Sequence, residues 1–173
     1  MKKKPLPTPK YFIQRACELG AIDAKDISPQ HVFTAEWVRR KCQYGCDGFG
    51  EHLTCPPYSP TPQETRRMLD EYEIAILIHC PSKKIDMHKL VYTLEREAFL
   101  SGYYKAFGMG SGPCNLCETC NVENICCHAE KARPSMEASG IDVFQTARIA
   151  GFPIEVVRDY NCTQNYYGLL LLK

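Results

Sequence analysis

Residues 74–78 read Ile-Ala-Ile-Leu-Ile, an unbroken apolar run in a chain of 173 residues. Five apolar residues in succession are short for a core helix and are typical of a strand that is buried on both faces. We therefore expect this run to lie inside a sheet that is flanked by helices. A chain of this length is long enough to build one domain with a substantial hydrophobic core.

Helical patterns occur on both sides of this run. The segment Thr61-Pro62-Gln63-Glu64 has the form of a capping box with Pro at the first helical position, which predicts a helix to about Tyr72. After the run, Ser82 is a suitable cap for a longer helix, because apolar residues recur at helical spacing between Leu90 and Ala98. Similar signals predict helices over residues 11–21, over 134–139 and from Asp142 to Gly151.

Further strands complete the expected sheet. Their patterns predict them over residues 32–38, 103–107, 154–157 and 166–172. The order of elements predicts one small domain of the α/β or α+β class, with a mixed sheet flanked by helices and two cysteine-rich metal-binding loops. Residues 1–10 are rich in Pro and Lys, so we expect an extended N-terminal arm there and the metal-binding domain over residues 11–173.

The eleven cysteines are unusual for a chain of this composition. Their number is odd, and the Met-Lys-Lys-Lys start is not followed by the apolar segment of an export signal. The apolar run Leu169–Leu172 is too short to cross a bilayer, and a net charge of +1 gives no one-signed surface. We therefore expect a cytoplasmic protein with no nucleic-acid or membrane partner, in which clustered thiols are metal ligands or catalytic groups.

The denser cysteine motif lies at residues 114–127, which read Cys-Asn-Leu-Cys-Glu-Thr-Cys-Asn-Val-Glu-Asn-Ile-Cys-Cys. Cys114, Cys117 and Cys120 have C-x2-C-x2-C spacing, which lets a turning backbone direct three thiolates at one compact object. Ferredoxins bind [4Fe–4S] clusters with such a run and a fourth cysteine after three more residues. Here the next cysteine, Cys126, follows after five residues. It either closes the same cluster or reaches another one.

Zinc is the alternative metal for this motif. Structural zinc sites usually take two short pairs of ligands from separate segments, so an overlapped triple suits a cube with several iron corners better than one tetrahedral ion. His128 follows the motif and is a suitable zinc ligand, which keeps the zinc interpretation open.

An earlier motif spans residues 42–57, in which Cys42, Cys46 and Cys55 have C-x3-C-x8-C spacing. Its glycines allow the loop to wrap closely around a bulky cofactor. Because only three thiols are local, either a fourth ligand completes the site or one iron stays open to substrate, as in catalytic metal sites. His52 is a nearby candidate, and the distant candidates are Cys80, Cys126, Cys127 and Cys162. Without a metal, the three cysteines would be small buried core residues.

Together these residues resemble a known family. The combined pattern is Cys42-x3-Cys46, Gly50, Cys55-Pro56-Pro57, Gly112-Pro113-Cys114-x2-Cys117-x2-Cys120, Cys126, His128 and the stretch 133–143. It is similar to the pattern of the predicted metal-binding proteins of bacteria and archaea over nearly the whole chain beyond residue 30. That family has Pro where this chain has Ala129, and a basic or polar residue in place of Cys127, which favours Cys126 as the ligand. The resemblance implies metal binding and no particular reaction.

Arg133 and Glu137 follow the second motif closely and have two interpretations. They either line a pocket beside a cluster, where Arg133 binds an anion and Glu137 handles protons, or belong to a short capped helix with a solvated glutamate. We expect the second, because helix-start signatures of this kind are common.

The motifs predict an iron–sulfur protein with one or two [4Fe–4S] clusters. The main hypothesis is electron transfer to a redox partner protein. One alternative is an enzyme in which a three-cysteine cluster offers an open iron to a small-molecule substrate. Another is a zinc-binding interaction module. The expected ligands are Cys114, Cys117, Cys120 and Cys126 for one cofactor, and Cys42, Cys46 and Cys55 for the other metal site.

Overall fold

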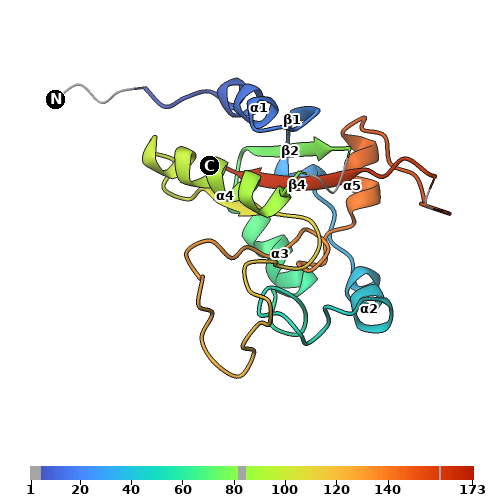
Figure 1. Ribbon diagram of the computed structural model, residues 1–173. Helices are drawn as coiled ribbons and strands as arrows, with labels where there is room; N and C mark the ends of the chain where they lie inside the picture. The colour runs from blue at the N-terminus through green and yellow to red at the C-terminus, as the bar shows by residue number, and fades with distance from the viewer. Residues whose placement is uncertain (1–4, 82–84, 160) are drawn as a thin grey trace.

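The computed structural model describes residues 5–81, 85–159 and 161–173 (Figure 1). The elements in chain order are α1 (Pro9–Glu18), β1 (Asp23–Ile27), the 3-10 helix η1 (Pro29–His31), α2 (Glu36–Gly45), α3 (Pro62–Leu69), β2 (Ala75–Cys80), α4 (Met87–Leu100), β3 (Phe107–Met109), α5 (Val143–Ile149) and β4 (Tyr166–Leu171). The strands form one sheet in the order β1-β2-β4-β3, and all three pairings are antiparallel. The domain therefore belongs to the α+β class, and its sheet is antiparallel where a mixed one was expected.

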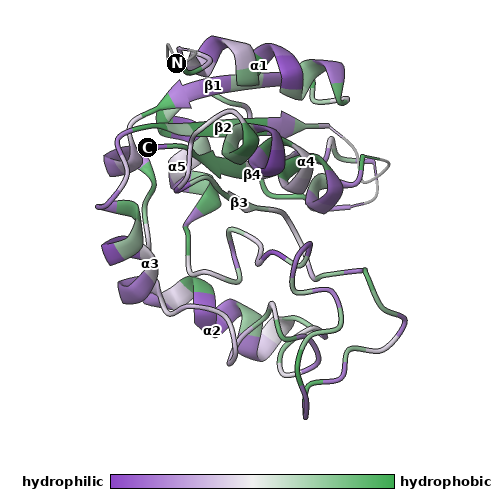
Figure 2. Ribbon diagram, turned by 90° about the vertical axis from the view of Figure 1, so that its left-hand side faces the viewer, coloured by the Kyte–Doolittle hydropathy of each residue, from purple (hydrophilic) through white to green (hydrophobic). Residues whose placement is uncertain are grey.

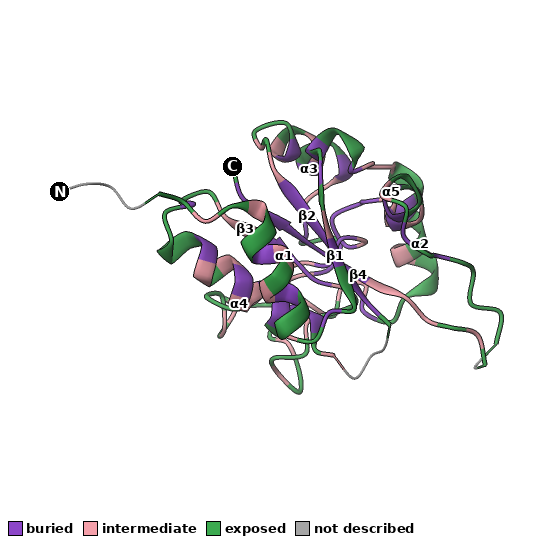
Figure 3. Ribbon diagram, turned by 90° about the horizontal axis from the view of Figure 1, so that it is seen from above, coloured by how far each residue is buried: buried purple, intermediate pink, exposed green. Residues whose placement is uncertain are grey.

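Strand β2 is the predicted apolar strand, and all six of its residues are buried. Ile76 and Ile78 pack into a core with α1 and α4, whereas Ala75 and Leu77 face a second core that includes residues of α3 and α5. Figure 3 shows the buried strands at the centre of the fold and exposed positions on the outer sides of the helices. Because both faces of β2 are covered, apolar residues occupy both sides of the strand.

The predicted helix starts at Thr61 and Asp142 are confirmed. At α3, the hydroxyl of Thr61 accepts a bond from the backbone N–H of Glu64 (3.2 Å), and Glu64 Oε2 accepts one from the N–H of Thr61 (2.8 Å). At α5, Asp142 Oδ1 accepts a bond from the N–H of Gln145 (2.9 Å). Caps are predictable from sequence because they depend on residues within a single turn.

Two of the predicted strands are wrong. In residues 32–38, Thr34 makes only an isolated bridge with Ile141, and α2 already begins at Glu36. Residues 154–157 are outside the sheet: Ile154 is buried, but Val156 is 63 % exposed and pairs with no strand of the described chain. Short apolar patterns suggested both strands, but a strand also needs a pairing partner, which such a pattern does not reveal.

Other boundaries also differ from the prediction. Strand β3 begins at Phe107 instead of Tyr103, and residues 134–139 form turns instead of a helix. Helix α4 begins at Met87 with Asp86 as its cap, and the predicted cap at Ser82 lies outside the described residues. Strand β1 was not predicted, because this edge strand buries only two of its five residues.

Both cysteine-rich segments lie on the side of the sheet away from α1 (Figures 1 and 2). The turn at residues 134–140 connects their surroundings. Ser135 pairs with Gly110, which lies just before the second motif, and Gly140 O accepts a bond from the N–H of Ala35 (2.8 Å), next to α2. In the described part of the chain, no helix combines the length and apolar character needed to cross a membrane.

Candidate metal centre

The first cysteine motif starts on a helix and continues into a tight loop. Cys42 lies in the last turn of α2, and Cys46 directly follows that helix. A Cβ atom added to Gly48 would lie 3.6 Å from both the Cys46 and the Cys55 Sγ atoms, so these two sulfur atoms flank the same glycine. The loop is closed by a bond from Gly50 N–H to Pro56 O (2.8 Å). The glycines thus allow thiols that are nine residues apart to converge.

Two thiols of this motif, Cys42 and Cys55, favour the protonated state when no cation is present. Burial raises the pKa of Cys55 to about 11, and the neighbouring Cys46 thiolate adds to the effect. Burial also raises the pKa of Cys42, helped by the charges of Cys46 and Glu137. A bound metal cation reverses this balance by stabilising the thiolates, so metal binding would release protons from this motif.

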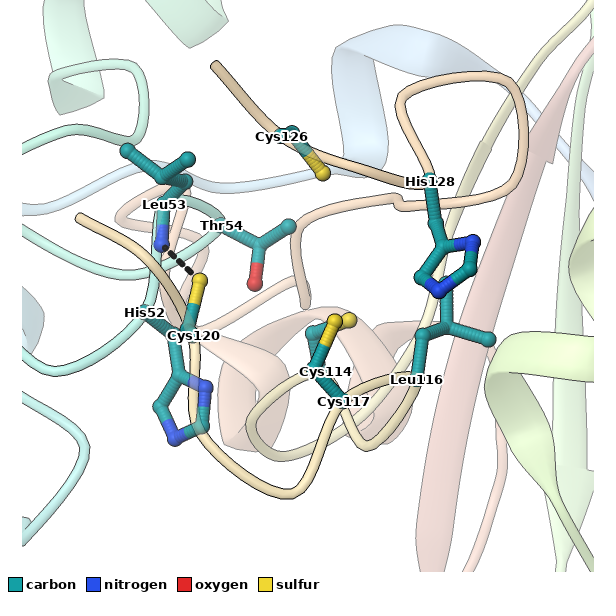
Figure 4. Close-up of a pocket in the computed structure, with 9 residues that line it drawn as sticks. All are labelled: His52, Leu53, Thr54, Cys114, Leu116, Cys117, Cys120, Cys126 and His128. Carbon is teal, nitrogen blue, oxygen red and sulfur yellow. Dashed lines mark hydrogen bonds between the residues drawn. The ribbon is translucent and has the colours of Figure 1, made fainter. Parts of the chain in front are cut away.

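The second motif brings its four predicted ligands to one cavity (Figure 4). Cys114, Cys117, Cys120 and Cys126 line this cavity together with His52, Leu53, Thr54, Leu116 and His128. The Cys126 sulfur points into the cavity from one side, and those of Cys114 and Cys117 point into it from another. Burial and then the charges of neighbouring thiolates raise the pKa of Cys117, as expected when several thiols share one space.

The two motifs are in direct contact. The backbone N–H of Leu53, in the first loop, donates to the Sγ of Cys120, in the second, at 3.5 Å. A Cβ on Gly48 would lie 3.5 Å from the Cβ of Pro113, the residue before Cys114. The segment between Cys46 and Cys55 therefore forms part of the wall of the second site.

The structure separates the remaining cysteines into different environments. Cys127 is exposed and does not line the cavity, whereas its neighbour Cys126 does. Cys80 is buried in the core formed with α1 and α4. Cys162 lies beside Asp159, with 3.6 Å between its Sγ and the carboxylate. All eleven cysteines lie in described residues and none forms a disulfide.

The two interpretations of Arg133 and Glu137 can now be separated. Arg133 forms a largely buried ion pair with Glu95, with 2.5 Å between Nη2 and Oε1, so its role here is structural. The expected solvated glutamate is wrong, because Glu137 Oε2 is buried and has no hydrogen-bond partner among the described residues. Burial also raises the pKa of Glu137.

Sequence reasoning missed three contributors to the site. The N–H of Leu53 and the hydroxyl of Thr54 face the second motif, and the Thr54 hydroxyl is buried without a partner in the described chain. The only hint in the sequence was their position directly before Cys55. The third is His88 on α4, whose Nε2 lies 3.2 Å from Gly112 O and supports the backbone before Cys114. Its place in an apolar helical pattern gave no hint of this role.

The donor set of the two motifs is not closed around a metal ion. Within the described residues, no three Cys, His, Asp or Glu side chains come close enough together to enclose one. The cavity of the second motif measures about 10 Å³, the least space that can hold one water molecule, so its walls must move apart to admit any cofactor. Surface loops are more mobile than the elements they connect, which permits such movement.

Comparison with known proteins agrees with this donor set. A sequence profile of the family described as predicted metal-binding protein (DUF2284) matches residues 25–172. No curated protein and no solved structure matches the chain significantly. The match covers both cysteine motifs and the whole sheet apart from the first two residues of β1. The chain therefore belongs to the DUF2284 family of predicted metal-binding proteins.

Proposed function

We propose that the chain is an iron–sulfur protein that transfers electrons through two [4Fe–4S] clusters in adjacent sites. The observation that carries the proposal is the cavity shared by Cys114, Cys117, Cys120 and Cys126 (Figure 4). Four thiolates are the usual ligand set of a [4Fe–4S] cluster, and the C-x2-C-x2-C run is the usual way to supply three of them. Cys42, Cys46 and Cys55 would bind the second cluster.

The bond from Leu53 N–H to Cys120 Sγ supports a redox role. A hydrogen bond to a ligating sulfur stabilises the reduced cluster more than the oxidised one, because the reduced cluster carries more negative charge. Such bonds therefore raise the reduction potential. In this chain the donor, Leu53, lies in the loop of the first motif, and the acceptor, Cys120, is a ligand of the second. The loop around the first cluster would therefore help to set the reduction potential of the second cluster.

The contact between the two motifs supports transfer of electrons from one cluster to the other. Each cluster would take one electron from a reduced donor protein and pass it to an oxidised acceptor, with no covalent bond made or broken. We place this chemistry in the cytoplasm, where free thiols stay reduced until a metal binds them.

A zinc-binding interaction module is the second candidate function. It is favoured by His128, which lines the same cavity as the four cysteines and would complete a mixed Cys/His set. An enzyme with an open iron at the three-cysteine site is the third, and it depends on whether that site has a fourth ligand.

Anaerobic purification followed by iron and acid-labile sulfide analysis tests the proposal. Two clusters require about eight irons and eight sulfides per chain, and one requires about four of each. The protein should be brown, and its visible absorbance should bleach when dithionite is added. Stoichiometric zinc without sulfide would contradict the proposal and support the interaction module.

A further inference from the structure

We infer that Glu137 is the fourth protein ligand of the site of Cys42, Cys46 and Cys55, and that its carboxylate closes a set of three sulfur donors and one oxygen donor. This inference rests on the proposed function, since it requires a [4Fe–4S] cluster at this site. It also replaces the open iron of the enzyme alternative with a protein oxygen.

The first observation is the state of the carboxylate itself. Among the described residues, Glu137 Oε2 is buried without a hydrogen-bond partner and no ion pair includes Glu137. Hydrogen bonds from the Ser135 side chain and from the Glu137 backbone N–H stabilise the carboxylate only in part, since burial still raises its pKa. The two nearby arginines are occupied elsewhere: Arg133 pairs with Glu95, and Arg39 donates to backbone carbonyls. A buried carboxylate without an ion-pair partner is costly unless it holds a proton or meets a cation.

The second observation is that the backbone holds Glu137 in place. The turn at residues 134–140 is closed by bonds from Ser139 N–H to Ser135 O (3.1 Å) and from Gly140 N–H to Glu137 O (2.9 Å). The next side chain back, Met136, is completely buried. The backbone position from which the Glu137 side chain projects is therefore fixed by this turn.

The third observation is that the turn is packed against the first cysteine motif. The hydroxyl of Ser59, four residues after Cys55, donates to Ala138 O at 2.6 Å. Arg39 binds the carbonyls of Pro57 and Pro60 at 3.0 Å each. Because Arg39 and Cys42 are three residues apart on α2, they lie on the same side of that helix. The motif's helix and its loop thus meet at the turn that carries Glu137.

The charges agree with this arrangement, since the Glu137 carboxylate is one of the groups that raise the pKa of Cys42. Repulsion between a carboxylate and a thiolate is a cost in the protein without metal, and a cation between them turns it into attraction. Oxygen is a harder donor than sulfur, so the iron bound by Glu137 would differ electronically from the three bound by thiolates.

Mössbauer spectra of the unmodified chain, purified anaerobically with ⁵⁷Fe, test the inference without any substitution. We expect one iron of the first cluster to have a larger isomer shift than the other three, as an oxygen-ligated iron does. Four equivalent thiolate-type irons at this cluster would overturn the inference and leave the proposed function intact. Absence of iron at Cys42, Cys46 and Cys55 would overturn both.

Variants provide the second test, with Glu137→Gln as the change and Glu130→Gln, in an exposed position, as the matched control. Ferricyanide would remove one electron and release one Fe²⁺ from the weakened cluster, which leaves a [3Fe–4S] centre with its own paramagnetic resonance signal. We expect this signal to form several-fold faster in Glu137→Gln than in the parent or the control. Glu137→Cys should abolish the distinct iron and restore resistance. Equal rates in the parent and Glu137→Gln would overturn the inference.

Discussion

Replacing Gly140 by alanine should destabilise the protein strongly, because this glycine ends the turn that carries Glu137. Gly140 has φ +74°, in the left-handed region, and its position lies against Pro62 at the start of α3. A Cβ there would lie 2.9 Å from Pro62 Cβ and 3.0 Å from Pro62 Cα. The second of these atoms belongs to the backbone, so relief requires α3 or the turn to move.

Two costs add to give the expected effect. An L-residue in the left-handed region costs about 1–2 kcal/mol. Forcing an extra carbon into a packed contact costs about 1–3 kcal/mol. Their sum, less the entropy that alanine removes from the unfolded chain, gives a loss of about 3 kcal/mol in the free energy of unfolding. With a slope of about 2 kcal/mol per molar of urea, the midpoint should fall by about 1.5 M.

Urea denaturation of the metal-free chain, followed by circular dichroism, measures this loss. Gly151→Ala is the control, because Gly151 has φ +71° but its added Cβ would meet its nearest neighbour, Lys25 Nζ, at an ordinary 3.5 Å. It should lose only the conformational cost, about 1 kcal/mol. If Gly140→Ala were no less stable than Gly151→Ala, the close packing of the turn against α3 would be refuted.

Three further predictions concern the cysteines and the buried ion pair. Cys117→Ser should lower the iron content by about half, whereas Cys80→Ser, in the core, should leave it unchanged; equal losses would contradict the ligand assignment. Burial raises the pKa of Cys55 from 9.0 to about 11, so this thiol ionises more readily in the unfolded chain than in the folded one. The metal-free chain should therefore lose roughly 2 kcal/mol of its free energy of unfolding as the pH rises from 9 to 11. That loss should be smaller in Cys55→Ala, and identical pH profiles would argue against burial of the thiol. Arg133→Met should lower the free energy of unfolding, measured by urea denaturation, by about 3 kcal/mol, because it leaves Glu95 buried without its ion-pair partner. The double variant Arg133→Met with Glu95→Leu should regain much of this loss. If the double variant recovered no stability, that would count against the pairing.

The elements that the sequence predicted well are those that depend on local residues. The strand at 75–80 follows from its apolar run, and α3 and α5 follow from the caps at Thr61 and Asp142. The strand predicted over 154–157 failed because pairing depends on a partner that is distant in sequence. Edge strand β1 was missed for the related reason that its outward residues are polar and its pairing to β2 supplies its order.

The candidate site was predictable to a similar extent. The spacing of Cys114, Cys117 and Cys120 indicated a common centre, and the structure places these residues with Cys126 around one cavity. The contact of the two motifs through Leu53 was not predictable, because it arises from the tertiary packing of two loops. The burial of Glu137 was not predictable either, since it depends on the loops and turns that cover it.

Native mass spectrometry of the chain purified without oxygen weighs the intact cofactors on the folded protein. If both motifs bind [4Fe–4S] clusters, the mass increment should equal two units of four irons and four sulfides. Removing Cys42, Cys46 and Cys55 together should leave one such unit on the second motif. An increment equal to one or two zinc ions, with no sulfide, would show that the two motifs bind zinc instead of iron–sulfur clusters.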